Sequence, residues 1–173
     1  DFFGQVHLLS KDSPFRKFFD NAQFPSMIFW GPPGVGKTTL AYLISKYGNF
    51  DFVRISAVES GVKELRNIIS KAENNFSKNK KTILSIDEIH RFNKSQQDAL
   101  LPYLEHGDFL FFGATTEYPQ TSLNRPLLSR LRPWQLLNLS ESEIVDILTV
   151  ALKEISRPSL ETFISPIAKS VNG

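Results

Sequence analysis

Residues 26–47 read SMIFWGPPGVGKTTLAYLISKY, and this stretch decides the fold. A short apolar run over 26–30 precedes a loop of glycine and proline, and a helical stretch follows from Gly36 to about Tyr47. The loop matches G-x-x-x-x-G-K-[ST] at every fixed position. Glycines let the backbone curl around phosphate oxygens, and the helix N-terminus adds its dipole. The strand–loop–helix unit therefore predicts a site for a nucleotide's phosphates.

This phosphate loop and the first residues of its helix are the predicted contacts with ATP. Lys37 is expected to reach the β- and γ-phosphates, and the Thr38 hydroxyl is expected to bind Mg²⁺. ATP and Mg²⁺ are thus the predicted cofactors. A glycine-rich turn that fits the pattern by chance is the alternative, and the flanking strand and helix argue against it. The expected binding residues are Gly31, Pro32, Pro33, Gly34, Val35, Gly36, Lys37, Thr38 and Thr39.

A second informative run is ILSIDE, residues 83–88, an apolar strand that ends in two carboxylates. Asp87 stands at the carboxyl end of this strand, where it can hold Mg²⁺ through water. Glu88 follows directly, so it points elsewhere and can act as the base that polarises the attacking water. An isolated Asp-Glu pair is more often a solvated strand end. Its position after the phosphate loop favours ATP hydrolysis instead.

Apolar runs and helical stretches alternate along the first 139 residues. The expected strands are 26–30, 52–55, 82–86, 108–114 and 134–137, and the expected helices are 36–47, 59–72, 95–105 and a short one near 127–128. The polar tract 73–81, which contains Lys78, Lys80 and Lys81, is expected to be a surface loop. This alternation predicts an α/β fold of the P-loop NTPase class, with a parallel five-stranded sheet flanked by helices.

The pattern changes after Leu139. Ser140 and Glu143 have the spacing of a capping box, and two amphipathic helical segments follow, 141–156 and 159–171, with no strand between them. We expect residues 1–139 to form the nucleotide-binding domain and residues 140–173 to begin a helical lid. The chain starts without methionine and stops with no helix-ending signal, so we expect it to be part of a longer protein.

Composition excludes several classes of protein. The 173 residues suit one globular domain, with 41% hydrophobic and 22% charged residues. A net charge of +2 is too small to indicate nucleic-acid binding by itself. The chain has no cysteine, which excludes disulfides and thiolate metal sites. No apolar run approaches the roughly 18 residues of a membrane span, and the N-terminus lacks the order of a signal peptide, so no membrane partner is expected.

Several motifs together resemble the AAA+ ATPases: GPPGVGKTTLA, IDEIH and GATTEYP, followed by LLSR. The block DEIHRFNKSQQDALLPYLEHGDFLFFGATTEYP…LNRPLLSR resembles the RarA/MgsA family of replication-associated recombination ATPases, whose human relative is the Werner helicase-interacting ATPase. The resemblance implies Mg²⁺-dependent ATP hydrolysis in replication-fork maintenance, recombination or repair. It also implies a DNA partner, a homo-oligomer in the full-length protein, and a bacterial cytoplasm (nucleoid-associated) or a eukaryotic nucleus.

The resemblance assigns roles to further residues. Gln5 and His7 match the segment that borders adenine, with an ordinary N-terminal turn as the alternative. Thr116 matches the sensor 1 position, unless it only caps a strand end. Arg130 matches the arginine finger that acts on a neighbour's nucleotide, unless it pairs with a carboxylate of its own chain. Ser56 occupies the place of the switch residue that restrains the catalytic glutamate, although a plain strand-end serine is the favoured interpretation. The predicted catalytic set is therefore Lys37, Glu88, Thr116 and Arg130.

The resemblance also assigns a role to two basic residues, and the chain differs from the family's pattern in two places. Arg91 and Lys94 match a region that faces DNA in clamp loaders, with a solvated basic face as the alternative. The sensor 2 arginine of relatives is absent, and Tyr118 stands where the family usually has asparagine. The string DEIH also resembles the DExH helicase box, but that class needs a second motor domain. The remaining alternatives are a clamp-loader or branch-migration subunit, related to the RuvB motor, and a nucleotide-binding scaffold without turnover.

Overall fold

The computed structural model describes residues 2–58, 67, 70, 81–107, 109–155 and 162–171. Its centre is a five-stranded sheet in the order β2-β3-β4-β1-β5, and every neighbouring pair of strands is parallel. The predicted α/β fold with a parallel five-stranded sheet is confirmed. The strands are β1 (Met27–Trp30), β2 (Asp51–Ser56), β3 (Thr82–Asp87), β4 (Leu110–Thr115) and β5 (Arg132–Gln135).

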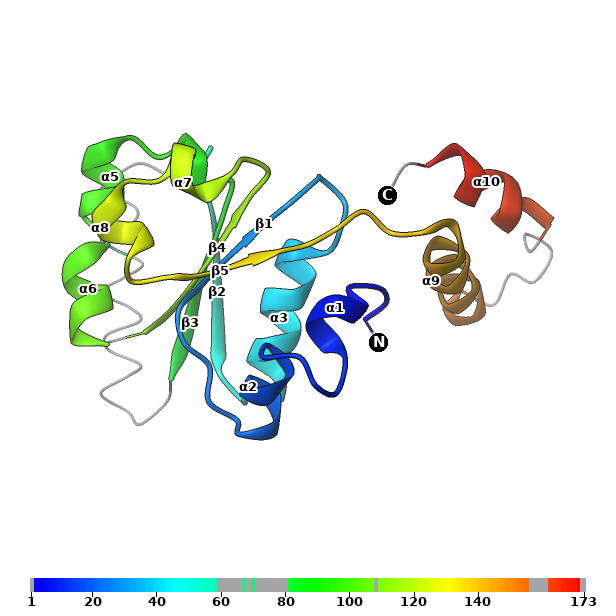
Figure 1. Ribbon diagram of the computed structural model, residues 1–173, viewed down its shortest axis with the longest axis horizontal. Helices are drawn as coiled ribbons and strands as arrows, with labels where there is room; N and C mark the ends of the chain where they lie inside the picture. Colours follow the sequence, from blue (N-terminus) through cyan, green and yellow to red (C-terminus); the bar gives the residue numbers. More distant parts are fainter. Residues whose placement is uncertain are drawn as a thin grey trace.

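Helices cover both faces of this sheet (Figure 1). Met27 and Phe29 of β1 join a core beneath α3, whereas Ile28 joins the core on the opposite face, as the two-residue period of a strand requires. Both faces are therefore buried, which is the usual state of a parallel sheet. One face carries α1 (Val6–Leu9), α2 (Arg16–Asp20) and α3 (Lys37–Tyr47), and the other carries η1 (Ile89–Arg91), α5 (Lys94–Asp98), α6 (Leu101–His106), α7 (Pro119–Ser122) and α8 (Arg125–Leu128).

The carboxyl ends of the strands bring the predicted site residues together. β1 lies between β4 and β5, and Trp30 is in register with Thr115 of β4. Ser56, the last residue of β2, is in register with Asp87, the last residue of β3. The chain segments that follow β1, β3 and β4 therefore all leave from one edge of the sheet. That edge is where open α/β sheets bind their ligands.

The expected helix 95–105 is wrong as a single element, because it is divided into α5 and α6. Pro102 lies in the first turn of α6 and has no N–H to continue a hydrogen-bond ladder from α5. Asn93 caps α5 through a capping box with Gln96, so that helix begins at Lys94. The sequence contains both signals, Pro102 and the capping box of Asn93, and a proline within a helical pattern indicates that a new helix starts there.

The boundaries of all five strands also differ from the expectation, those of β1 and β3 by one residue at one end. β2 begins at Asp51, β4 runs from Leu110 to Thr115, and β5 runs from Arg132 to Gln135 instead of over 134–137. The pairing with β1 sets the position of β5, because Met27 is in register with Arg132 and Trp30 with Gln135. The expected helix 59–72 lies outside the described residues except for Asn67 and Ser70, which are helical, and the tract 73–80 lies outside them entirely.

The sequence pattern does not predict α1 and α2, because their stabilising contacts come from distant parts of the chain. Phe15, which precedes α2, is fully buried. Its ring lies 5.0 Å from that of Trp134 on β5 and 6.2 Å from that of Phe29 on β1, measured between centroids, in edge-on arrangements. This aromatic cluster anchors the N-terminal segment beneath the sheet.

Two helices follow β5 beyond an extended connection (Figure 1). α9 (Glu141–Glu154) begins with the expected capping box: the Ser140 side chain accepts a hydrogen bond from the N–H of Glu143, and Glu143 accepts one from the N–H of Ser140. α10 (Ile164–Ser170) packs against α9 and is shorter than the expected 159–171, of which 159–161 lie outside the described residues. The division into domains at residue 139 stays a prediction. Among the described residues, no helix is long and apolar enough to cross a membrane.

Candidate nucleotide-hydrolysis site

The loop between β1 and α3 has a backbone that glycine alone adopts without strain. Gly31 has a φ of 147°, and a Cβ added there would lie 2.1 Å from the carbonyl oxygen of Leu136. Gly36 has a φ of 93° and directly precedes α3, and its added Cβ would lie 3.0 Å from the Phe2 ring. The glycines that define the sequence motif are therefore required by the shape of the loop.

Lys37 lies inside this loop with only 7% of its surface exposed. Its Nζ donates hydrogen bonds to the carbonyl oxygens of Gly31, at 2.8 Å, and Pro32, at 2.6 Å. Burial lowers the pKa of Lys37, while the carboxylates of Glu88 and Asp87 act in the opposite direction. A buried ammonium group whose hydrogen bonds go to loop carbonyls fits a ligand that brings negative charge of its own, such as a polyphosphate.

Thr38 and Asp87 meet beside Lys37. The Thr38 hydroxyl donates a 2.8 Å hydrogen bond to Oδ1 of Asp87. Mg²⁺ in nucleotide sites usually takes one or two protein oxygens together with phosphates and water. A hydroxyl and a carboxylate oxygen side by side at the phosphate loop fit that requirement, so the residues present fit the predicted cofactor.

Arg54 is a site residue that sequence reasoning missed. Its Nε donates to Oδ2 of Asp87 at 2.6 Å, and its Nη2 lies 2.6 Å from the same oxygen. Ser56 is the strand partner of Asp87, and Arg54 stands two residues before Ser56. The side chains of Arg54 and Asp87 therefore lie on one face of the sheet. The β2–β3 register, once known, would have identified it. Its guanidinium contacts Oδ2 of the carboxylate, whereas Thr38 contacts Oδ1.

Glu88 has an unusual backbone and a histidine partner. Its φ is 53°, in the left-handed region that non-glycine residues rarely adopt, and its side chain is 39% exposed. The Oε2 of Glu88 lies 3.3 Å from Nδ1 of His90, whose side chain is only 5% exposed. Sequence reasoning included His90 in the IDEIH motif and in the family block without giving it a role, and it missed this contact. The carboxylate keeps access to solvent on one side and is held on the other.

Among the described residues, no side-chain hydrogen bond to Asp87 or Glu88 tests the expected roles of Thr116 and Ser56. Thr116 is exposed just after β4, between buried Thr115 and exposed Glu117. Within the part of the chain that the structure describes, no side-chain hydrogen bond joins Ser56 to Glu88. The sensor role of Thr116 stays a prediction, and the plain strand-end interpretation of Ser56 remains the favoured one.

Arg130 follows α8 and is held by its own chain. Its Nη1 donates to the carbonyl oxygen of Pro126 at 2.7 Å, and its Nη2 forms an ion pair with Glu105 of α6. The alternative stated above, pairing with a carboxylate of the same chain, is thus present in this structure. Both side chains remain partly exposed, at 34% and 53%, so the guanidinium is accessible from outside. Action on a neighbouring subunit stays a prediction.

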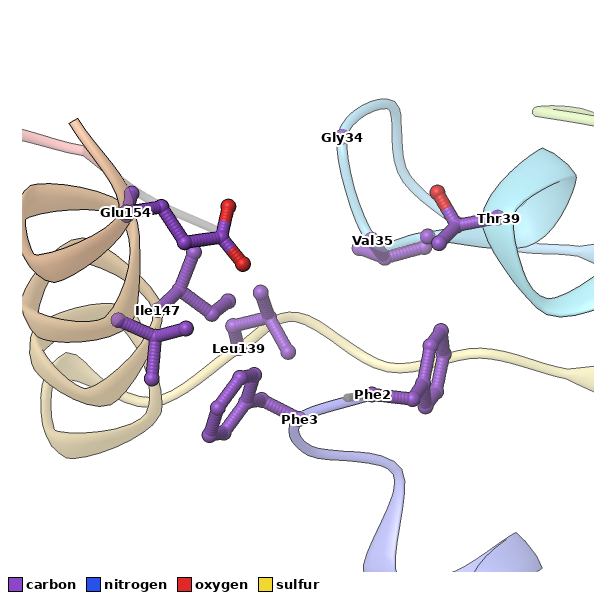
Figure 2. A pocket seen from close by; sticks show the side chains of 11 residues that line it. Phe2, Phe3, Gly34, Val35, Thr39, Leu139, Ile147 and Glu154 are labelled. Atoms are coloured by element: carbon purple, nitrogen blue, oxygen red, sulfur yellow. The ribbon is translucent and has the colours of Figure 1, made fainter. Parts of the chain in front are cut away.

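A cavity of about 330 Å³ opens beside the phosphate loop, between α3, α9 and the N-terminal segment (Figure 2). Phe2, Phe3, Leu139 and Ile147 face it, and the Glu154 carboxylate points toward it from α9. A mostly apolar cleft with a polar group at its edge suits a flat heteroaromatic base. Its place next to Val35 puts such a base within reach of bound phosphates.

Gln5 and His7, expected to border adenine, do not line this cavity. Gln5 donates to the Leu137 carbonyl oxygen at 2.7 Å and accepts from the Leu137 N–H at 2.8 Å, while Nε2 of His7 lies 2.9 Å from the carbonyl oxygen of Gln135. His7 ties the N-terminal segment to β5 and Gln5 ties it to the residues directly after β5, and their expected role beside adenine stays a prediction. The lining residues Phe2 and Phe3 were missed because an isolated Phe pair carries no signal of its own.

The fold and the phosphate loop define a P-loop nucleotide-binding domain, and comparison with known proteins identifies its family. The model of the ATPase family associated with various cellular activities (AAA) matches residues 27–139. The chain belongs to this family. The match covers the sheet from β1 to β5 and ends at Leu139, directly before the cap of α9.

The chain is also similar to individual proteins of known name. The chain is 51% identical over 156 residues to Replication-associated recombination protein A of Escherichia coli (strain K12), covering 90% of this chain and 35% of that protein. It is 47% identical over 144 residues to ATPase WRNIP1 of Dictyostelium discoideum, covering 83% and 16%. The RuvB Holliday junction branch migration motor of Thermotoga maritima superposes with a TM-score of 0.72 at 26% identity, covering 89% and 52%. The chain therefore spans about a third of the bacterial relative's length.

Proposed function

We propose that this chain is the Mg²⁺-dependent ATP-hydrolysing domain of an AAA+ ATPase that acts on DNA in replication-fork maintenance, recombination or repair. The observation that carries the hydrolytic part is the meeting of Lys37, Thr38, Asp87 and Glu88 at one edge of the sheet. A phosphate-binding cation, a metal-binding oxygen pair and a held but accessible carboxylate are the three parts that phosphoryl transfer to water needs.

Each residue has a distinct part in the proposed reaction. Lys37 exchanges its loop carbonyls for the β- and γ-phosphate oxygens, which compensates its buried charge. Thr38 and Asp87 hold Mg²⁺, which, when bound, offsets the charge of the transferred phosphoryl group. Glu88 takes a proton from the attacking water. Phe2, Phe3 and Ile147 hold the adenine in the adjoining cavity.

The DNA-related part of the proposal is supported by the printed names of the relatives. One is named for replication-associated recombination and another for branch migration at Holliday junctions. We extend this class of activity to the full-length protein and expect it to work as a homo-oligomer. A bacterial cytoplasm, or a nucleus in a eukaryote, is the corresponding compartment, because chromosomal DNA lies there.

Hydrolysis by the full-length protein, with no DNA, single-stranded DNA and forked DNA, tests this proposal. We expect hydrolysis above the background of Lys37→Ala, and a rate that rises with DNA, because ring ATPases couple turnover to their substrate. A rate equal to that of Lys37→Ala in every condition would identify a silent scaffold. Turnover that no DNA changes would refute the DNA-related part. Migration of a four-way junction, in the same preparation, would favour the branch-migration alternative.

The surface around Arg91 and Lys94 gives the proposal a residue-level prediction. Both side chains are exposed, at the end of η1 and the start of α5. If they contact DNA phosphates, Arg91→Gln and Lys94→Gln should each weaken binding of any DNA sequence and reduce the salt slope by about one unit. Lys17 is exposed on α2, a helix that lies away from α5 in Figure 1, and it supplies the matched control Lys17→Gln. If the salt slopes of both variants equal that of the control, Arg91 and Lys94 do not contact DNA phosphates and belong to a solvated basic face.

A further inference from the structure

His90 joins the acidic pair to the loop that follows β4. Its Nδ1 lies 2.9 Å from Oγ1 of Thr115 and 3.3 Å from Oε2 of Glu88, and its Nε2 lies 3.7 Å from Oε1 of Glu117. The Thr115 hydroxyl oxygen also accepts a 3.0 Å hydrogen bond from the N–H of Glu117. One nearly buried imidazole thus contacts three residues from two different segments.

Hydrogen-bond chemistry determines which atom carries the hydrogen in the contact between Nδ1 of His90 and Oε2 of Glu88. An ionised carboxylate only accepts hydrogen bonds, and so does an imidazole nitrogen that carries no hydrogen. A contact of 3.3 Å between Nδ1 and Oε2 is therefore attractive only when Nδ1 carries the hydrogen. The Nδ1–H then donates to Oγ1 of Thr115 at 2.9 Å, and Oε2 of Glu88 lies 3.3 Å from the same nitrogen, as a close contact beside that hydrogen bond. The Glu88 carboxylate thus lies against a polar N–H edge of an imidazole on η1, at a position where its own backbone is in the left-handed region.

The position of Thr116 connects the contacts of His90 to the predicted nucleotide site. Thr115 and Glu117, the two partners of His90 after β4, lie on either side of it. Any shift of Thr116 toward a γ-phosphate moves both partners of the imidazole, because neighbouring residues share a backbone. In the described part of the chain, Ser56 makes no comparable bond to Glu88.

We propose that His90 is a positioning residue that orients the carboxylate of Glu88 and couples it to the Thr115–Glu117 loop. This inference rests on the proposed function, in which Glu88 is the base, and on the predicted sensor role of Thr116. His90 touches neither phosphate nor water. It fixes where Glu88 stands relative to the loop that senses the nucleotide.

Two substitutions of similar shape separate the two ring nitrogens. His90→Asn places an amide N–H₂ near the position of Nδ1, and His90→Gln places one near the position of Nε2. We expect His90→Ala to lower kcat of the full-length protein by about 10²-fold, the size of effect that misplacing a reacting group produces. We expect His90→Asn to recover most of that loss and His90→Gln to recover little. Affinity for a fluorescent ATP analogue should stay near the parent value in all three.

Thr115→Val tests the other end of the contact, because valine keeps the shape and removes the hydroxyl. We expect it to lower kcat as well, and the double variant with His90→Ala to lose less than the product of the two single losses. Thermal denaturation shows which variants are folded. If neither His90→Asn nor His90→Gln folds, Thr115→Val carries the test, and a parental kcat in that variant overturns the inference.

Glu88→Gln, measured in parallel, distinguishes the two ways of failing. If Glu88→Gln turns over ATP at the parental rate, Glu88 is not the base and the proposed function is wrong. If Glu88→Gln is inactive but folded His90→Asn and His90→Gln have equal kcat, at any level, only the role of His90 is refuted. A loss in nucleotide affinity that accounts for the whole rate loss would likewise reduce His90 to a packing residue.

Discussion

Glu88→Gln in the full-length protein is expected to bind ATP as the parent does and to lower kcat by about 10²–10⁴-fold, the usual contribution of a general base. Glutamine has the shape of glutamate but cannot take a proton from water. Lys37, Thr38 and Asp87 keep their contacts, so the nucleotide still binds. Single-turnover hydrolysis measures the rate, and a fluorescent ATP analogue measures the affinity.

Two further variants serve as controls for this result. Lys37→Ala should lose ATP binding itself, because it removes the buried ammonium that faces the phosphates. Glu141→Gln, which neutralises an exposed carboxylate at the start of α9, should leave both quantities unchanged. A change in kcat without a change in affinity, found for Glu88 alone, identifies a group that acts in the transition state. Parental turnover by Glu88→Gln would remove Glu88 from the mechanism.

The phosphate loop and the acidic pair were predictable because their signals are local. Glycines at fixed spacing between an apolar run and a helix determine the shape of the loop, and the φ values of Gly31 and Gly36 agree with that reading. An apolar run that ends in Asp87 and Glu88 places both carboxylates at a strand end. Parallel strands then bring these segments to one edge without further information.

The contacts that sequence reasoning missed depend on residues far apart in the chain. The N-terminal helices are held by Phe15 against Trp134, more than a hundred positions away, and no periodicity reports such a pair. The partner of Asp87 on β2, Arg54, follows from the register of two strands separated by a long connection. His90 shows its role only when Thr115 and Glu117 of β4 and its following loop are placed beside it.

The contribution of Arg130 to hydrolysis is expected to come from the neighbouring subunit. This residue follows α8, which lies on the face of the sheet opposite α3, the helix that starts at the phosphate loop (Figure 1). Its contacts with Glu105 and Pro126 hold the guanidinium in place while leaving it partly exposed. An arginine supplied across an interface stabilises charge in the transition state and is worth about 10³–10⁵ in rate where it has been measured in GTPases.

Mixing two inactive full-length proteins tests this directly. Arg130→Ala keeps an intact phosphate loop, and Lys37→Ala keeps an intact Arg130, so a mixed oligomer places some intact loops opposite intact arginines and should recover part of the activity. Arg125→Ala, an exposed arginine at the start of α8, is the matched control and should hydrolyse ATP alone. Glu105→Gln removes the ion pair and should lower the rate less than Arg130→Ala, because the Pro126 carbonyl still holds the guanidinium. If subunits demonstrably exchange and the mixture stays inactive, Arg130 serves its own chain through Glu105, and the assignment across the interface is wrong.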